Sequence, residues 1–382
     1  MTDETASDDD GGGRAWTARV RRLVRARPKT ALAATAAVAV LAAGVGTWAA
    51  GIGPFEEEDR YCWGAWEEGS GPEFLSDGDG SRTSEETAPT AKRPRGRCTV
   101  AIRSEHAGST GTYVSKAEVT VTYGPAPGDA AKRVEWLDTY LSGSAVPLPD
   151  GLPGAVDGDR GLLVLPERCD TPDGRPTAVT LDSDARTDWN DGVSVPDGAE
   201  LGGTRSVAAL LVAAANRGME AAGCAPAKPL RVTSPVLTLA EKKEDFFTRA
   251  CRINGMELDE GTSDGLAYQV GAVTRDFQSC SVRLSRGADR FFDALMVAQP
   301  RLAALLDGVT GDKPPARGWR GTGVFTDTGG YKVVRAECAG RPVTLVALAP
   351  ATRETTPYFV AFANSVTQRL GCAPIAPGGA GR

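Results

Sequence analysis

Residues 364–374 read NSVTQRLGCAP and closely repeat residues 216–226, which read NRGMEAAGCAP. Both stretches end in Gly-Cys-Ala-Pro, and each has an Asn eight residues before its Cys. Two further matches stand upstream in the same order, around Cys169 and Cys338 and around Cys98 and Cys280. Chance gives an isolated match more readily than three in one order, so the chain is interpreted as two copies of one unit.

Several short segments carry strand patterns. Glu118–Tyr123 alternates polar with apolar or aromatic residues, which predicts a half-buried strand beginning near Tyr113. Cys98, Val100 and Ile102 alternate in the same way, so we expect this cysteine on the inward face of its strand. Two strand pairs are predicted in corresponding places of the two units, at 162–165 with 177–181 and at 331–336 with 343–348.

Helical patterns complete each unit. Asp129 to Leu141 has a capping Asp and an apolar stripe, and Ala288 to Leu306, interrupted at Pro300, is its expected counterpart. Each unit closes with a predicted helix, at 205–222 and at 357–370. The predicted fold class is therefore α+β: two tandem copies of a disulfide-bonded sheet-plus-helix domain after one transmembrane helix.

The transmembrane helix is expected at Thr30 to Ile52, which is 23 residues without a charge. A helix of that length would cover about 34 Å, enough for a hydrocarbon core of about 30 Å. Six arginines and a lysine lie between 14 and 29, whereas acids follow the segment at 56–59. The positive-inside rule then places the N-terminus in the cytoplasm and the chain after Pro54 outside.

A cleaved signal peptide is the alternative interpretation of this segment. It would need a shorter leader and a small-residue cleavage site, and Thr47-Trp48-Ala49 is a poor match to such a site. Upstream, Trp16, Val20, Leu23 and Val24 share one helical face, so this stretch either lies on an anionic leaflet or acts only as a topology signal.

These patterns divide the chain into five expected regions. They are a cytoplasmic tail at 1–29, the transmembrane helix at 30–52, an extracytoplasmic repeat at 55–228, a second repeat at 229–376 and a disordered tail at 377–382. A mobile loop is expected at 67–97 inside the first repeat, because it is rich in Gly, Ser, Glu, Thr and Pro. Its basic end, Lys92 to Arg97, either meets anionic wall polymers or is a solvated loop end.

All eight cysteines lie on the side predicted to be external, where an even number indicates disulfides. Metal binding and redox catalysis are disfavoured because no C-x-x-C is present and the closest pair is 27 residues apart. Four cysteines per unit allow three pairings. The third cysteine follows a strand, and the fourth ends a helix that is expected to cover that sheet. We therefore favour Cys62–Cys98, Cys169–Cys224, Cys251–Cys280 and Cys338–Cys372.

Other chemistry-bearing residues lack a supporting pattern. His106 is the single histidine and stands in a polar stretch, so it is expected to be an exposed loop residue. Gly261 to Gly265 fits G-x-S-x-G in letters but not in flanking structure, and is interpreted as a turn. The acidic residues between Asp182 and Asp191 either bind calcium or form a turn. Tyr61, Trp63 and Trp66 either stack on a sugar or pack against a disulfide.

Composition narrows the function classes further. The chain has 382 residues, 41% of them hydrophobic, and a net charge of −6, which excludes global disorder and argues against a nucleic-acid binder. The Arg-rich leader, the single span, Cys62-Trp63-Gly64 and Gly-Cys-Ala-Pro resemble uncharacterised actinobacterial single-pass membrane proteins with cysteine-paired extracytoplasmic domains. The resemblance covers most of residues 14–376, and its motifs are structural.

Two functions remain after this reading. The first is a non-enzymatic, membrane-anchored envelope protein whose external domains bind a partner, an envelope protein or wall polymer, or support an envelope assembly. The alternative is a surface hydrolase that uses carboxylates. No catalytic, cofactor or metal residues are assigned. Two carboxylates converging in a cleft would favour the enzyme, whereas two filled cores and an exposed apolar groove would favour binding.

Overall fold

The structure is a computed structural model, and it describes most of the chain after residue 59. The described residues are 60–67, 69, 81–108, 111–189, 194–197, 201–239, 243–244, 250–253, 255–256, 266–284, 290–326, 330–349 and 354–378. The predicted cytoplasmic tail, the predicted transmembrane helix at 30–52 and Gly261 to Gly265 lie outside them. Residues 59–382 form one compact unit.

Most of the regular structure is antiparallel sheet. A two-stranded sheet pairs β1 (Arg60–Tyr61) with β2 (Trp66–Glu67). Sheet 1 runs in the order β3 (Ser81–Thr87), β4 (Gly96–Gly108), β5 (Gly111–Pro125), β9 (Thr177–Trp189), β8 (Arg160–Val164), β7 (Gly154–Val156) and β6 (Val146–Pro147), and β10 (Ser194–Asp197) also pairs with β9. Sheet 2 runs in the order β11 (Lys243–Glu244), β12 (Leu266–Val273), β13 (Phe277–Leu284), β14 (Arg290–Val297), β17 (Arg341–Leu348), β16 (Tyr331–Cys338) and β15 (Thr322–Phe325).

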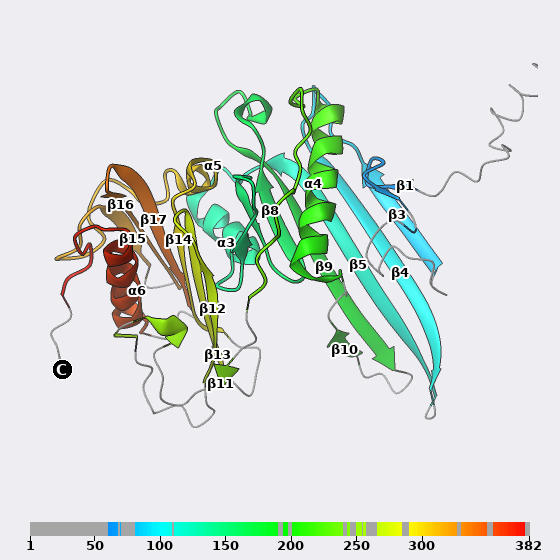
Figure 1. Cartoon of the computed structure of the whole chain (residues 1–382). Helices are drawn as coiled ribbons and strands as arrows, with labels where there is room; N and C mark the ends of the chain where they lie inside the picture. Colours follow the sequence, from blue (N-terminus) through cyan, green and yellow to red (C-terminus); the bar gives the residue numbers. More distant parts are fainter. Residues whose placement is uncertain are drawn as a thin grey trace, which may run out of the picture. The chain divides into compact units, whose positions relative to one another are not determined.

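The helices are fewer and mostly short. They are α3 (Ala130–Tyr140), α4 (Gly203–Ala222), α5 (Pro300–Ala303) and α6 (Thr356–Arg369), with 3₁₀ turns η2 (Glu167–Cys169), η3 (Ala250–Arg252) and η4 (Ala304–Leu306). Asp129 caps α3 by accepting a hydrogen bond from the Lys132 N–H at 2.9 Å, as expected. Figure 1 shows the two large sheets with α4 in front of one and α6 beside the other.

The predicted sheet-plus-helix α+β class is wrong, because the described part of the chain is dominated by three sheets. Among the described residues, no helix is long and apolar enough to cross a membrane. Two strands account for much of the error. β3 falls inside the expected mobile loop 67–97. β14 occupies most of the part before Pro300 of the helix expected at 288–306, whereas the part from Pro300 onward is helical, as α5 and η4. β3 is polar and almost entirely exposed, whereas β14 is almost entirely buried, so neither shows the alternation that marks a strand.

The two large sheets share one strand order. In sheet 1 the path β3-β4-β5-β9-β8-β7 corresponds, strand by strand in chain order, to β12-β13-β14-β17-β16-β15 in sheet 2. Cys98 on β4 and Cys280 on β13 occupy corresponding strands. In each case a helix follows the last of these strands along the chain, α4 after β9 and the short β10, and α6 after β17. This correspondence covers the segments whose sequences repeat.

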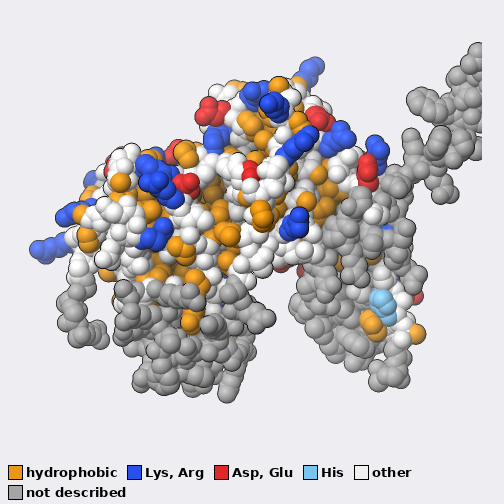
Figure 2. Space-filling model, viewed as in Figure 1, with side chains coloured by type: hydrophobic (Ala, Val, Ile, Leu, Met, Phe, Trp, Pro, Cys, Tyr) orange, Lys and Arg blue, Asp and Glu red, His pale blue; other side chains and the backbone are white. Residues whose placement is uncertain are grey.

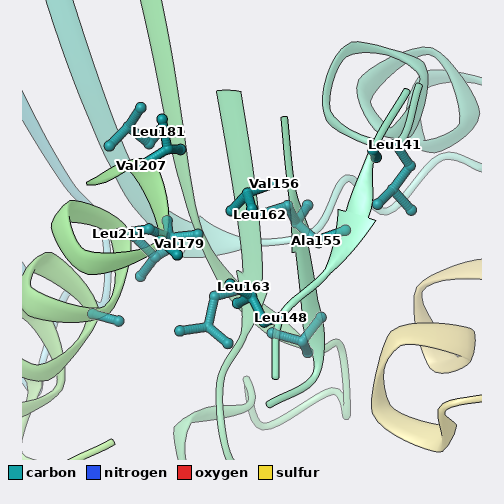
Figure 3. Close-up of a cluster of buried hydrophobic side chains, with 14 of the residues drawn as sticks. Leu141, Leu148, Ala155, Val156, Leu162, Leu163, Val179, Leu181, Val207 and Leu211 are labelled. Atoms are coloured by element: carbon teal, nitrogen blue, oxygen red, sulfur yellow. The ribbon is translucent and has the colours of Figure 1, made fainter. Parts of the chain in front are cut away.

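The core of sheet 1 lies between the sheet and α4. Val207 and Leu211 of α4 pack toward Val179 and Leu181 of β9, and all four side chains are fully buried (Figure 3). The pairs β8–β9 and β16–β17 confirm the strand pairs expected from the sequence. Cys98 is fully buried on this inward face, which confirms the expected alternation.

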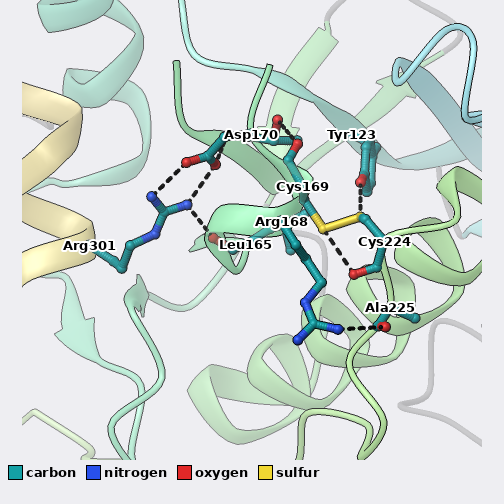
Figure 4. The surroundings of a disulfide bond; sticks show 9 residues. Tyr123, Leu165, Arg168, Cys169, Asp170, Cys224, Ala225 and Arg301 are labelled. Carbon is teal, nitrogen blue, oxygen red and sulfur yellow. Dashed lines mark hydrogen bonds and ion pairs between the residues drawn. A yellow bond between two sulfur atoms is a disulfide. The ribbon is translucent and has the colours of Figure 1, made fainter. Parts of the chain in front are cut away.

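Four disulfides connect segments of the chain, two within the first half and two within the second. They are Cys62–Cys98, Cys169–Cys224, Cys251–Cys280 and Cys338–Cys372, the pairs favoured from their order in the chain. Figure 4 shows that the Cys169–Cys224 bridge connects η2, which follows β8, to the segment just after α4. The bridge therefore fastens the covering helix to its sheet.

Sheet 2 is covered on both faces. Phe359 and Phe362 of α6 fill one face together with Phe292 and Leu345 of the sheet. The opposite face belongs to the same core as sheet 1, because Leu295, Val346 and the η4 residue Leu305 are buried in that cluster. The two halves consequently share one hydrophobic core.

Polar contacts reinforce this junction. Arg301 on α5 forms a two-pronged ion pair with Asp170, at 2.7 and 2.8 Å, and also donates to the Leu165 carbonyl (Figure 4). The Ser279 hydroxyl donates to the Ala145 carbonyl at 2.8 Å. Arg290 pairs with Asp138 of α3 at 2.6 Å. Each of these bonds joins the first half to the second.

Candidate functional site

The most open feature of the described chain is the face of sheet 1 turned away from α4, here called the open face. Alternate residues of β4, β5 and β9 point into the α4 core, so their neighbours point to the other side. The β3 residues that pair with these neighbours belong to the same face. The open face therefore consists of Ser81, Thr83, Glu85, Thr87, Arg97, Thr99, Ala101, Arg103, Lys116, Glu118, Thr120, Thr122, Ala178, Thr180, Asp182 and Asp184. Every one of them except the two alanines is polar or charged.

One end of the open face is a basic hollow of about 320 Å³. Arg93, Arg95 and Arg97 line it together with Trp136 of α3, the threonines of β3, β5 and β9, and backbone of β5. No Asp or Glu is among its lining residues. Since three guanidinium groups face the space without a carboxylate, the hollow carries net positive charge.

The walls of the basic hollow have specific supports. The aliphatic stem of Arg95 lies over Gly124, where an added Cβ would come within 3.8 Å of its Cγ. Trp136 is half-buried and meets Tyr140 edge to face, with ring centroids 5.8 Å apart. These contacts hold one cation and one aromatic ring at the rim of the space.

The other end of the open face is a mixed-charge hollow of about 410 Å³. Its charged lining residues are Arg103, Lys116, Glu118 and Asp184, so positive and negative side chains balance. Lys116 is paired with Asp188 at 2.7 Å, and Arg103 with Glu105 at 3.3 Å. This hollow therefore lacks the uncompensated charge of the basic one.

Hydroxyl groups connect the two hollows. Thr99 on β4 and Thr120 on β5 are directly opposite each other, and their hydroxyls are 3.0 Å apart. Thr122 and Thr180 continue this surface into the basic hollow. Because a hydroxyl can both donate and accept, such a surface matches a ligand that is itself rich in hydroxyls.

The corresponding face of sheet 2 is not open. Its residues Ser279, Asp293, Leu295 and Val346 are buried against the first half. The Asp293 carboxyl has no exposed surface, and its pKa is raised by burial, although Arg283 and Arg290 oppose that shift. One copy of the fold thus uses this face for internal packing, whereas in the other it is polar and, apart from Ala178 and Thr180, at least partly exposed.

A carboxylate cluster lies at the turn between β7 and β8. Burial, together with a hydrogen bond that the protonated Asp159 carboxyl donates to the neighbouring Asp157 carboxylate, raises the pKa of Asp159 to about 7. The Ser142 hydroxyl donates to Asp157 at 3.1 Å, and Arg160 pairs with Asp182 of the open face at 2.8 Å. The sequence analysis did not identify this pair, because an Asp-Gly-Asp turn is common in loops.

The residues considered from the sequence have structural roles where they are described. All eight cysteines are in disulfides. His106 lies on the exposed part of β4, rather than in a loop, and stacks on Tyr113 with ring centroids 4.9 Å apart. Tyr61 and Trp66 are buried beside Cys62, and the Trp66 indole donates to the Leu210 carbonyl, so they pack rather than bind.

The possible calcium site is only partly described. Asp182, Asp184 and Asp188 lie along β9, and the first and last of these pair with Arg160 and Lys116. In the part of the chain that the structure describes, no group of three or more His, Cys, Asp or Glu side chains is placed to hold a metal ion. Asn190 and Asp191 lie outside those residues.

Figure 2 shows the same side of the molecule as Figure 1, the side on which α4 lies. Lys and Arg side chains are spread over this side and do not gather into one patch. The three arginines of the basic hollow are thus distinguished by their shared cavity rather than by the overall charge. Comparison with family models, with curated proteins and with solved structures finds no match for this chain.

Proposed function

We propose that the protein is a non-enzymatic, membrane-anchored envelope protein that binds an envelope component on the open face of sheet 1. Residues 30–52 are its anchor, the arginine-rich tail is cytoplasmic, and the part after Pro54 is extracytoplasmic. The charge asymmetry around that segment supports this orientation. The four disulfides support an oxidising compartment, where such bonds persist. The resemblance to actinobacterial single-pass membrane proteins agrees with it.

The observation that carries the proposal is the different use of one face in the two copies. In sheet 2 this face is apolar enough to join the shared core through Leu295 and Val346. In sheet 1 the same face presents threonines and charged residues over four strands and contains two hollows. A polar face gains little from burial against another core, but its hydroxyls and charges suit a polar ligand.

Binding is tested with the extracytoplasmic part, residues 59–378, secreted so that its disulfides form. It is expected to sediment with the isolated envelope of the source cells. Thr120→Arg places a large side chain between the two hollows and is expected to weaken this binding at least tenfold. Ala209→Arg, on the exposed side of α4, is the matched control and should leave binding unchanged. Equal binding by both variants would reject the open face as the binding surface.

Orientation is tested separately in protoplasts. Protease added outside is expected to remove the chain after Pro54 and to spare the arginine-rich tail, as antibodies against each end would show. Protection of the C-terminal end would contradict the anchored, extracytoplasmic arrangement.

The alternative function, a surface hydrolase that uses carboxylates, is favoured by one observation. Asp157 and Asp159 form a hydrogen-bonded carboxyl pair, and the pKa of Asp159 is raised to about 7, as in a general acid. Neither residue lines the basic or the mixed-charge hollow. Release of soluble fragments from the envelope by the wild-type protein but not by Asp159→Asn would replace the binding proposal with this one.

A further inference from the structure

We propose that the basic hollow binds the anionic group of a charged sugar unit, and that the open face holds the rest of an anionic glycan chain. This inference rests on the proposed function and specifies the ligand class of the same face. The charged group is a phosphate or a carboxylate, both of which an arginine fork recognises with two hydrogen bonds.

Charge is the first argument. Within the described residues, the side chains of Arg93, Arg95 and Arg97 form no ion pair or hydrogen bond with another side chain or with the backbone. Other arginines of the first half do have such partners; Arg160 pairs with Asp182 and Arg175 with Asp173. Three arginines converging on one space without a counter-charge repel one another, and an anion in that space would relieve the repulsion.

Shape is the second argument. Trp136 lines the hollow together with the three arginines and comes from a different element, α3. Its indole is half-buried and keeps some surface toward the hollow. An aromatic ring in this position offers an apolar surface on which the face of a sugar ring can stack, while the arginines take the charge. An anion without a ring would leave the indole unused.

Length is the third argument. Arg97 in the basic hollow and Arg103 in the mixed-charge hollow lie on the same strand, six residues apart. At about 3.4 Å per residue they are separated by about 20 Å along β4. The Thr99 and Thr120 hydroxyls lie in the interval, flanked by Glu85 on β3 and by Asp182 on β9, whose carboxylate is paired with Arg160. A single sugar would occupy only the basic hollow, whereas a chain of several units would follow the hydroxyls to the second hollow.

The test measures binding of the extracytoplasmic part, residues 59–378, to four defined polymers. Polygalacturonate carries carboxylates on sugars, phosphomannan carries phosphates on sugars, dextran is a neutral glycan, and polyglutamate is an anion without sugars. At least one of the two anionic glycans is expected to bind tenfold or more tightly than both dextran and polyglutamate. Whichever of the two binds more tightly identifies the charged group.

Variants then locate the site. Arg95→Ala and Arg97→Ala are each expected to weaken binding of the anionic glycan at least fivefold, and Trp136→Leu to weaken it while leaving polyglutamate unchanged. Arg217→Ala, on the exposed surface of α4, removes the same charge elsewhere and should have no effect. Since Arg95 and Arg97 are both exposed, their replacement should leave the fold intact, and near-ultraviolet circular dichroism checks this.

Three results would overturn the inference. They are equal binding of polyglutamate and the anionic glycans, equal binding of dextran, and wild-type affinity in both arginine variants. If the arginine variants still sediment with the envelope while Thr120→Arg does not, the ligand class is wrong and the proposed function stands. If the wild-type protein does not bind the envelope at all, the proposed function itself fails.

Discussion

The ion pair between Arg301 and Asp170 gives the most direct test of whether the two halves unfold together as one cooperative unit. Arg301 comes from α5 in the second half, and Asp170 follows η2 in the first. Their side chains are 20% and 15% exposed, and the guanidinium also donates to the Leu165 carbonyl. Arg301→Met keeps most of the aliphatic stem and removes only the charge and the donors.

The expected cost follows from the groups left behind. Removing one partner of a fully buried pair costs about 3–5 kcal/mol, and the residual exposure here reduces this to about 2–3 kcal/mol. Among the described residues, the Asp170 carboxylate then keeps only the Thr177 N–H as a hydrogen-bond donor, at 3.2 Å. Asp170→Asn should recover part of the loss in the Arg301→Met background, with a coupling energy of at least about 1 kcal/mol.

The assay is urea unfolding of residues 59–378 with the disulfides intact, followed by tryptophan fluorescence and by far-ultraviolet circular dichroism. A shared core predicts that both probes report one transition and that Arg301→Met moves it as a whole. Arg217→Met is the control, because its pair with Glu220 is exposed and should contribute less than about 0.5 kcal/mol. A loss below about 0.5 kcal/mol for Arg301→Met, or two separate transitions, would refute the reasoning.

Three other predictions concern stability. The double variant Cys338→Ala/Cys372→Ala removes the disulfide that closes a loop in the unfolded chain, and is expected to lower the free energy of unfolding by about 4 kcal/mol. A loss below about 1 kcal/mol in urea unfolding would contradict this expectation. Burial, and after it Asp157, raises the pKa of Asp159 to about 7 from the ordinary 3.8. Between these two pH values the native state therefore keeps a proton on Asp159 that the unfolded chain releases. Stability from this group therefore falls between about pH 4 and pH 7 and is constant above, and Asp159→Asn should remove that fall; parallel pH profiles for the two proteins would exclude it. Gly218→Ala, which in an exposed helix would stabilise by about 1 kcal/mol, is expected instead to lower the melting temperature, because its Cβ would lie 2.5 Å from the Tyr123 ring. A melting temperature equal to or above that of the wild type would show that the ring can move aside.

Sequence patterns predicted the elements that have one buried face. Glu118 to Tyr123 alternates because Val119, Val121 and Tyr123 face α4 while the residues between them face outward. The disulfide pairs followed from cysteine order, since each unit closes its helix onto its sheet. β14 was mistaken for a helix because it is buried on both faces by the junction of the halves. The contact between the two halves cannot be predicted from the order of apolar and polar residues within one strand.

The candidate site could be predicted only in fragments. Lys92 to Arg97 stood out as a basic run, but nothing in the sequence joins it to Trp136 or Thr180, which come from a helix and a strand far along the chain. Strand pairing brings Arg97, Thr122 and Thr180 into one row. β3 was missed because an exposed edge strand needs no apolar residues, so its sequence resembles that of a loop.

The Cys62–Cys98 disulfide has a mechanical consequence for a tethered protein. It joins the chain just after the proposed anchor to β4, which is flanked by β3 and β5. Tension between the membrane and a held ligand would pass through the sulfur atoms to Cys98, whose neighbour Arg97 lines the basic hollow. Residues 63–97, including the edge strand β3, lie within the closed loop and would carry little of that load. Pulling on the anchor would therefore load an interior strand of the sheet rather than peel away its edge.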